Sequence, residues 1–130
     1  MSNIGSNGFT LEETKELKKN ALKAVRDYRE TQPVEYKGYL YDFDEKSYQR
    51  ILAAIYAVGD GGSIYWTTAD NDVVNVTAFD LKNVIAAAAA RSNVLHQRYR
   101  ELKDMISEAK SVEEVEGIEW DLKNEDLQIQ

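Results

Sequence analysis

Apolar side chains recur at steps of three and four residues in three parts of the chain, which is the spacing of one face of an α-helix. The first part begins at "TLEE", where Thr10 and Glu13 have the spacing of a capping box, and it should end near Glu30, before the Thr-Gln-Pro sequence at 31–33. The predicted core face of this helix comprises Leu17, Ala21, Val25 and Tyr28.

The second segment with helical spacing is shorter than the first. Asp44 is a suitable N-cap residue, and the "GDGG" sequence at 59–62 is typical of a helix end followed by a turn. We therefore predict a helix between them. Its expected core face comprises Tyr48, Ile51, Leu52, Ile55 and Val58.

The third part is the most regular, and Thr77 with Asp80 has the pattern of a capping box at its start. Its apolar seam keeps heptad spacing over four repeats. The seam comprises Leu81, Ile85, Ala88, Ser92, Leu95, Tyr99, Leu102, Ile106 and Ala109. An unbroken helix over 78–110 would be about 50 Å long, against roughly 30 Å for a small domain. We therefore expect either a bend near Ser92-Asn93 or a far end that projects from the domain.

Two other segments change to a period of two residues, which predicts β-strands. In "VEYKGYLYDF" (34–43), Lys37-Gly38 is placed as the two-residue turn of a hairpin. A second hairpin is predicted over 63–77. In this hairpin Ile64 and Trp66 share the face that packs on the long helix, and Tyr65 lies on the other face.

These elements predict an α+β fold, with two β-hairpins packed on a small bundle of three main helices. At 130 residues, the chain should form one domain. We assign residues 10–120 to the domain, 1–9 to a flexible arm and 121–130 to an acidic tail. Ser111 and Gly117 bracket a further short helix, and the end of the chain, with Trp120, is expected either to dock as a strand or to remain loose.

Charge is unevenly distributed, and this limits the possible partners. The formal net charge is -7, and residues 111–130 contain seven acidic residues and one lysine. Because no basic face is evident, we do not expect nucleic-acid binding. No segment approaches the roughly 20 apolar residues of a membrane span, and no secretory signal is visible, so the expected location is the cytoplasm or a particle assembled there.

Candidate catalytic and metal-binding motifs are absent or incomplete. The chain has no cysteine, and His96, its only histidine, is expected on the exposed side of the long helix. The "DND" sequence at 70–72 lacks the later glycine and glutamate of a calcium loop, and "GDGG" lacks the lysine and spacing of a phosphate loop. We therefore predict a non-enzymatic protein without a cofactor.

Two features suggest protein–protein contact, and each has a structural alternative. Tyrosine suits interfaces because it offers apolar area and a hydroxyl group, although exposed hairpin tyrosines are also common. The heptad seam and the alanines at 86–90 favour close helix packing, either on the first helix of the same chain or between two copies of the chain. The candidate partner-binding residues are Tyr36, Tyr39, Tyr41, Tyr65, Leu95, Tyr99 and Leu102.

Three ordered motifs resemble a known family. They are "FDxxSYxRI" at 43–51, "WTTADNDVVNVTAFDL" at 66–81 and "LHQRYRELKDMISEAKSVEEVEGIEW" at 95–120. Together they are similar to a small domain of unknown function found in tail fibre and tail fibre assembly proteins of tailed bacteriophages. The resemblance covers about residues 20–120. It implies no catalytic residues.

The resemblance implies a role in the virion tail, by docking onto a tail or tail-fibre protein. The alternative function is a transient tail fibre assembly chaperone that is absent from the mature particle. A third possibility is a small host-directed regulator that reuses the domain. A homo-oligomer formed through the long helix is compatible with each of these.

Overall fold

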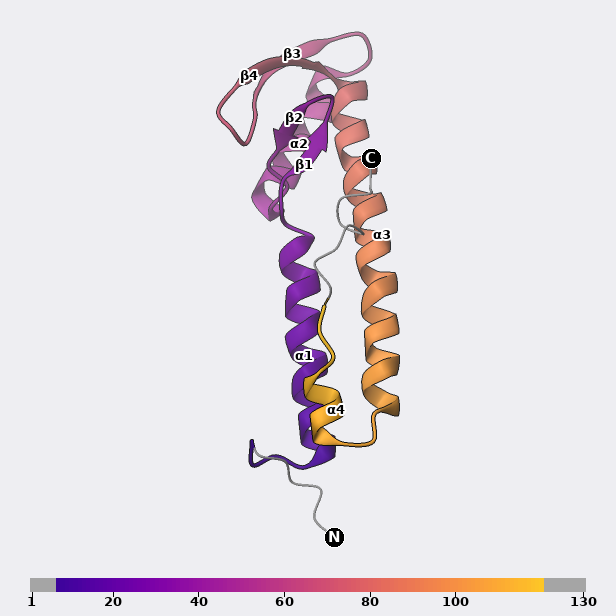
Figure 1. Cartoon of the computed structure of the whole chain (residues 1–130). Coiled ribbons are helices and arrows are strands. Elements are labelled where there is room, and N and C mark those ends of the chain that lie inside the picture. Colours follow the sequence, from indigo (N-terminus) through magenta and orange to yellow (C-terminus); the bar gives the residue numbers. More distant parts are fainter. Residues whose placement is uncertain (1–6, 121–130) are drawn as a thin grey trace.

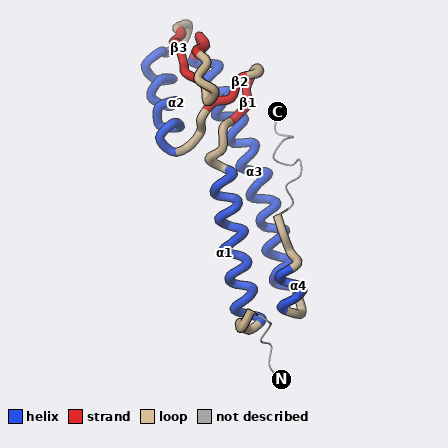
Figure 2. The backbone as a smooth tube through the Cα atoms, turned by 60° about the vertical axis from the view of Figure 1, so that its left-hand side comes forward, coloured by secondary structure: helices blue, strands red, loops and turns tan. Residues whose placement is uncertain are grey.

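A computed structural model describes residues 7–120 and has the predicted α+β fold, with two antiparallel hairpins and one long helix (Figures 1 and 2). The elements, in chain order, are α1 (Leu11–Arg29), β1 (Val34–Tyr36), β2 (Tyr39–Tyr41), α2 (Glu45–Val58), β3 (Ser63–Thr67), β4 (Val73–Thr77), α3 (Ala78–Glu108) and α4 (Val112–Glu116).

The molecule is elongated along α3, and we divide it into a head and a stem. The head comprises β1 to β4, α2 and the part of α3 before Arg91, whereas the stem comprises α1, α4 and the rest of α3. Figures 1 and 2 show the hairpins and α2 beside the first half of α3, and α1 beside its second half. In the stem, α1 also packs against α4.

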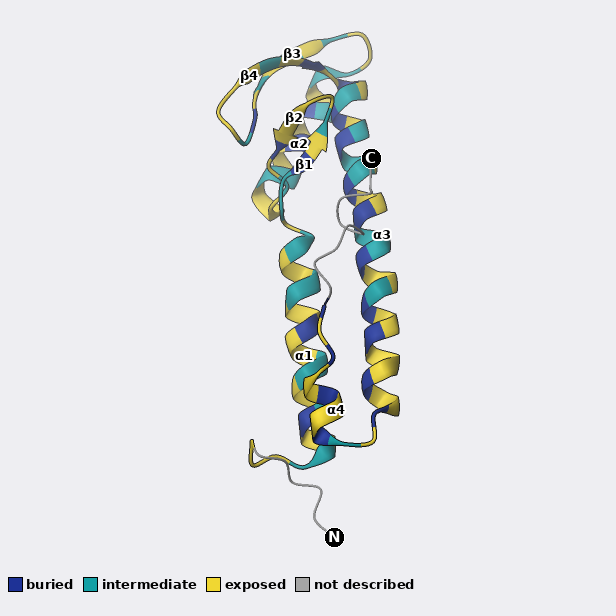
Figure 3. Cartoon of the chain, in the orientation of Figure 1, coloured by how far each residue is buried: buried dark blue, intermediate teal, exposed yellow. Residues whose placement is uncertain are grey.

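Each part has its own hydrophobic core (Figure 3). The buried residues of the head core are Val34, Tyr41, Ile51, Ala54, Val76, Leu81, Val84 and Ala88. Those of the stem core are Leu22, Leu95, Tyr99, Leu102, Ile106, Ala109, Val115, Ile118 and Trp120. Both lists include residues of the predicted α3 seam, so this seam is covered by other elements of the same chain.

Local signals in the sequence position the helix starts. The Thr10 hydroxyl accepts a hydrogen bond from the Glu13 N–H (3.1 Å), and the Glu13 carboxylate accepts one from the Thr10 N–H (2.9 Å). Thr77 and Asp80 form the same reciprocal pair at the start of α3 (3.0 and 2.9 Å). Both predicted capping boxes are therefore confirmed.

Both predicted hairpins form, and the first has the predicted two-residue turn. Tyr36 pairs with Tyr39 around Lys37 and Gly38, which both have positive φ (52° and 85°), as a two-residue turn of this type requires. In the second hairpin, Asn71 has φ 66°, and the Thr68 N–H donates to the Asp72 carbonyl oxygen at 2.8 Å. The "DND" sequence therefore forms the chain reversal between β3 and β4.

The long helix neither bends at Ser92-Asn93 nor projects from the domain. It is continuous over 31 residues, or about 46 Å at 1.5 Å per residue. Both expectations assumed a roughly spherical domain with a diameter of roughly 30 Å. The domain is instead extended along α3, and α1 and α4 cover the half of α3 that the hairpins leave uncovered.

Two predicted helix faces are partly wrong. In α1 the residues that face the core are Leu11, Thr14, Leu22 and Val25, whereas Leu17, Ala21 and Tyr28 are exposed. In α2, Leu52 is exposed and Ala54 is buried. Both helices carry apolar residues on more than one face, and α1 buries Thr14, whose hydroxyl group donates to the Thr10 carbonyl oxygen at 2.8 Å.

The end of the described chain packs on the stem without forming a strand. Ile118 and Trp120 are buried in the stem core. The predicted tail at 121–130 and residues 1–6 of the predicted arm lie outside the described residues. Within the described part of the arm, the Asn7 side chain donates to the Glu116 carboxylate at 2.8 Å.

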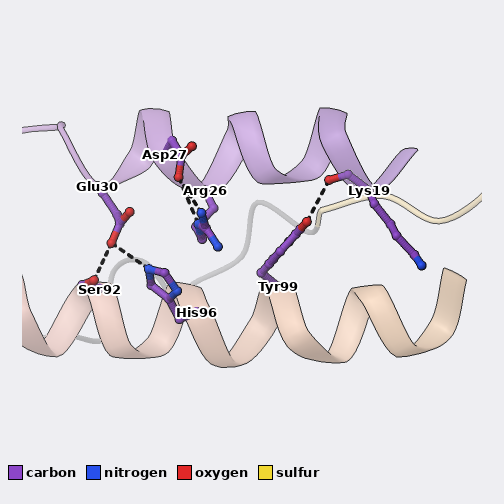
Figure 4. Close-up of polar contacts among 7 residues, drawn as sticks. All are labelled: Lys19, Arg26, Asp27, Glu30, Ser92, His96 and Tyr99. Carbon is purple, nitrogen blue, oxygen red and sulfur yellow. Dashed lines mark hydrogen bonds and ion pairs between the residues drawn. The ribbon is translucent and has the colours of Figure 1, made fainter. Parts of the chain in front are cut away.

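Polar contacts join α1 to the middle of α3. Arg91 is 8% exposed, and its guanidinium group donates to the carbonyl oxygens of Glu30 (2.9 Å) and Pro33 (3.1 Å). The Glu30 carboxylate accepts from the Ser92 hydroxyl and lies 3.1 Å from His96 Nε2 (Figure 4). Further along the stem, the Tyr99 hydroxyl donates to the Lys19 carbonyl oxygen at 3.0 Å.

We predict that Arg91→Met lowers the free energy of unfolding by about 2–3 kcal/mol, because two half-buried carbonyl groups lose a charged donor. Arg91→Lys should recover only part of the loss, since an ammonium group lacks the planar fork of a guanidinium group. Urea denaturation measures the effect, with the exposed Arg100→Met as the control. Equal urea midpoints for Arg91→Met and Arg100→Met would contradict the predicted loss of stability.

Asp80 links the first hairpin to the start of α3. Its carboxylate accepts hydrogen bonds from the Thr77 N–H and the Tyr36 hydroxyl (2.8 Å), and Lys37 Nζ lies 3.5 Å away. The Thr77 hydrogen bond, followed by the Tyr36 hydroxyl, lowers the pKa of Asp80. The stabilisation is therefore fully present above the ordinary aspartate pKa of about 3.9, and it is lost as the pH falls through the lowered pKa of the folded state.

Asp80→Asn should lower the free energy of unfolding by about 1 kcal/mol at pH 7, and this difference from wild type should shrink as the pH falls towards 3. Urea midpoints measured at both pH values test this expectation. The exposed Asp60→Asn is the matched control and should follow the wild-type profile. If the free energies of unfolding of wild type and Asp80→Asn differ by the same amount at both pH values, the charge of the Asp80 carboxylate does not contribute to stability.

Candidate protein-docking surface

Exposed large apolar side chains are concentrated in the head. The most exposed are Tyr56 (88%), Tyr65 (74%) and Phe79 (69%). We use "head surface" for the full set in this part of the molecule, which comprises Tyr39, Leu40, Leu52, Tyr56, Tyr65, Val73 and Phe79. In the described part of the stem and in the segment at 7–10 before α1, the exposed large apolar residues are Phe9, Leu17, Tyr28 and Met105.

The β3–β4 hairpin turns one face inward and one outward. Ile64, Trp66 and Val74 pack against the head core, and β3 contacts α2. Because side chains alternate along a strand, Tyr65 and Val73 lie on the opposite face. Tyr65 pairs with Asn75, and Val73 pairs with Thr67. Tyr65 and Val73 are therefore diagonal neighbours on the outward face, a separation that an aromatic side chain can span.

The outward face of α2 is also apolar. Leu52 and Tyr56 are four residues apart, so they lie one above the other on the helix surface. Ala53 and Ala57 are exposed as well, and the sequence from 51 to 59 contains no charged residue. An exposed helix face normally carries charge, so the absence of charge here favours a contact surface.

Phe79, in the first turn of α3, is a further exposed aromatic residue of the head surface. Asp80, the next residue, makes the capping contacts described above, and Ala78 is buried. The capping box therefore holds the backbone at Phe79 in a fixed position. Phe79 itself does not contribute to the head core.

The predicted partner-binding residues divide into three groups. Tyr39 and Tyr65 are exposed and belong to the head surface. Tyr36 is half-buried, and its hydroxyl group donates to Asp80. The remaining four residues, Tyr41, Leu95, Tyr99 and Leu102, are buried in the cores of this chain and offer no surface to a partner in this fold.

The burial of these four residues has a simple physical reason. A seam along α3 needs a covering surface, and α1, α4 and the head provide it within the chain. In the first hairpin, Tyr39 and Tyr41 lie on the same face. Tyr41 pairs with Val34 inside the head core and is buried, whereas Tyr39 lies next to the Lys37-Gly38 turn and is exposed. A tyrosine hydroxyl group is protonated at neutral pH and can donate. Burial, followed by the hydrogen bond to Asp80, raises the pKa of Tyr36 above its ordinary value.

Five residues of the head surface were not predicted from the sequence. Leu40, Tyr56, Val73 and Phe79 were not singled out, and Leu52 was assigned to the core. The uncharged sequence at 51–59 was the available signal for Tyr56, because its apolar residues are too numerous to fit on one buried face. For Phe79 no pattern distinguished an exposed aromatic residue from a buried one.

In the described part of the chain, no group of three or more His, Cys, Asp or Glu side chains is arranged to hold a metal ion. His96 is exposed and contacts Glu30. Among the described helices, none has the length and apolar character needed to cross a membrane.

The fold and its surface define a small α+β domain with an exposed apolar head. A family model described as a domain of unknown function (DUF4376) matches residues 13–124. Because the match covers most of the chain, the protein belongs to this family. The match includes every described element from the third residue of α1 onward. Neither the curated proteins nor the solved structures include a significant match to this chain.

Proposed function

We propose that this protein is a non-enzymatic structural component of a bacteriophage tail, and that it docks onto a tail or tail-fibre protein through its head surface. The observation that carries the docking proposal is the exposure of Tyr56, Tyr65 and Phe79 on regular, well-packed elements. The assignment to a tail rests on the resemblance of three ordered sequence motifs to a domain of phage tail fibre and tail fibre assembly proteins.

The energetics favour a protein partner. Aromatic side chains are enriched among the residues that contribute most to interfaces, because they bury a large apolar area and have few rotatable bonds to restrict. Tyr56 and Tyr65 also carry hydroxyl groups that can form hydrogen bonds at the edge of a contact. Exposed apolar patches commonly mark binding sites. Leu52 with Tyr56 on α2, and Tyr65 with Val73 on the β3–β4 hairpin, are local patches of this kind.

The scaffold favours docking without a large rearrangement. Tyr65 is on a strand whose other face packs into the head core, and Tyr56 is on a helix whose opposite face contributes Ile51 to that core. These elements fix the backbone under the exposed side chains. A partner therefore meets a preorganised surface, and less ordering entropy is lost on binding.

The test is co-expression with each tail and tail-fibre protein encoded in the same genome, followed by affinity purification. Tyr65→Ala and Tyr56→Ala should each weaken binding at least tenfold, which corresponds to about 1.4 kcal/mol. Leu17→Ala is the matched control, because Leu17 is an exposed apolar residue of the stem. Circular dichroism and urea midpoints show whether each variant remains folded.

Two results would contradict this proposal. One is wild-type protein that binds none of the tail or tail-fibre proteins. The other is folded Tyr65→Ala and Tyr56→Ala variants that bind as tightly as the Leu17→Ala control. The second result would reject the head surface while leaving a tail role open to another surface.

A further inference from the structure

The stem has an apolar groove that is separate from the head surface. Its volume is about 630 Å³, and it lies between α1 and the chain segment at 118–120. Ala21, Ala24 and Val25 form part of its lining, with Tyr28 and Trp120 among the larger side chains. Lys18, Arg29 and Glu119 also line it, so two cationic groups and one anionic group accompany its apolar surface.

The groove arises from the two apolar faces of α1. One face, which includes Leu22, is buried in the stem core. The other includes Ala21, Ala24 and Tyr28, which are exposed. Since the two alanines have short side chains, they leave space beside Tyr28 that another segment can occupy.

The indole group of Trp120 provides independent evidence that the groove binds another segment. The residue is 7% exposed, and its indole N–H has no hydrogen-bond acceptor within the described structure. Its ring lies 5.3 Å from the Arg29 guanidinium carbon. A buried donor without an acceptor costs about 1–3 kcal/mol, so a carbonyl or carboxylate oxygen brought to this position would be stabilising.

We propose that this groove binds residues 121–130 of the same chain. Trp120 is the last described residue and lines the groove, so the following residues begin beside it. Ten residues span at most about 33–36 Å, enough to reach along α1. The segment combines Leu122, Leu127 and Ile129 with three acidic residues (121, 125 and 126) and one lysine (123). This composition complements an apolar groove whose charged lining is Lys18 and Arg29 with one acidic residue, Glu119.

The family match and the covalent connection both favour this occupant. The match continues past Trp120 to residue 124, so Leu122 lies within the family domain. A tethered segment also has a high effective concentration at its site, and even weak individual contacts are sufficient for binding. The bound segment would cover the exposed apolar face of α1 and supply backbone carbonyl groups to the Trp120 indole.

NMR spectroscopy of the full-length, ¹⁵N-labelled protein tests this inference. The two tryptophans give two indole N–H signals, which a Trp66→Phe variant assigns. Leu122→Ser combined with Leu127→Ser should shift the Trp120 indole signal and the amide signals of Ala21 and Ala24, and should speed solvent exchange of that indole N–H by at least fivefold. Asn124→Ser with Gln128→Ser is the matched control in the same segment and should leave these signals in place.

Unchanged Trp120, Ala21 and Ala24 signals in the leucine double variant would overturn the inference. Wild-type shifts that depend on protein concentration, with a doubled mass in light scattering, would also overturn it in favour of a second copy in the groove. Neither result would bear on the head surface, because the signals of Tyr56 and Tyr65 report on that site separately.

Discussion

One face of α3 is buried along almost the whole helix, and both hydrophobic cores are built on it. Leu81 and Val84 contribute to the head core, and Leu95 and Leu102 to the stem core. Neither two-stranded sheet is large enough to be stable in water alone, so each depends on a helix to cover its apolar face. Arg91 lies between the cores and holds the end of α1 on this helix through two carbonyl groups.

This arrangement explains how a small chain can present a large apolar surface and still fold. The stem core forms without any contribution from the hairpins. The head core is built on α3, and the strands and α2 contribute their inward faces to it. The outward faces, with Tyr56 and Tyr65, are therefore not required for folding. This separation is consistent with the separate contacts proposed for the head surface and for the stem groove.

Much of this fold was predictable because its signals are local. The capping boxes at Thr10 and Thr77, the turn at Lys37-Gly38 and the seam of α3 each depend on a few neighbouring residues. The exposed and buried faces were less predictable. The two apolar faces of α1 have similar patterns, and only the position of α3 decides which one is buried. For the candidate site, Tyr39 and Tyr65 were identified, whereas the contacts of Arg91 join segments about 60 residues apart in sequence.

The proposed role in a tail is tested most directly by mass spectrometry of gradient-purified particles of the phage that encodes the protein. The account predicts that the protein is present in a fixed ratio to the tail proteins, and that this ratio survives further purification. Its absence from particles, together with abundance in infected-cell lysate, would contradict a structural role and would indicate a transient assembly factor.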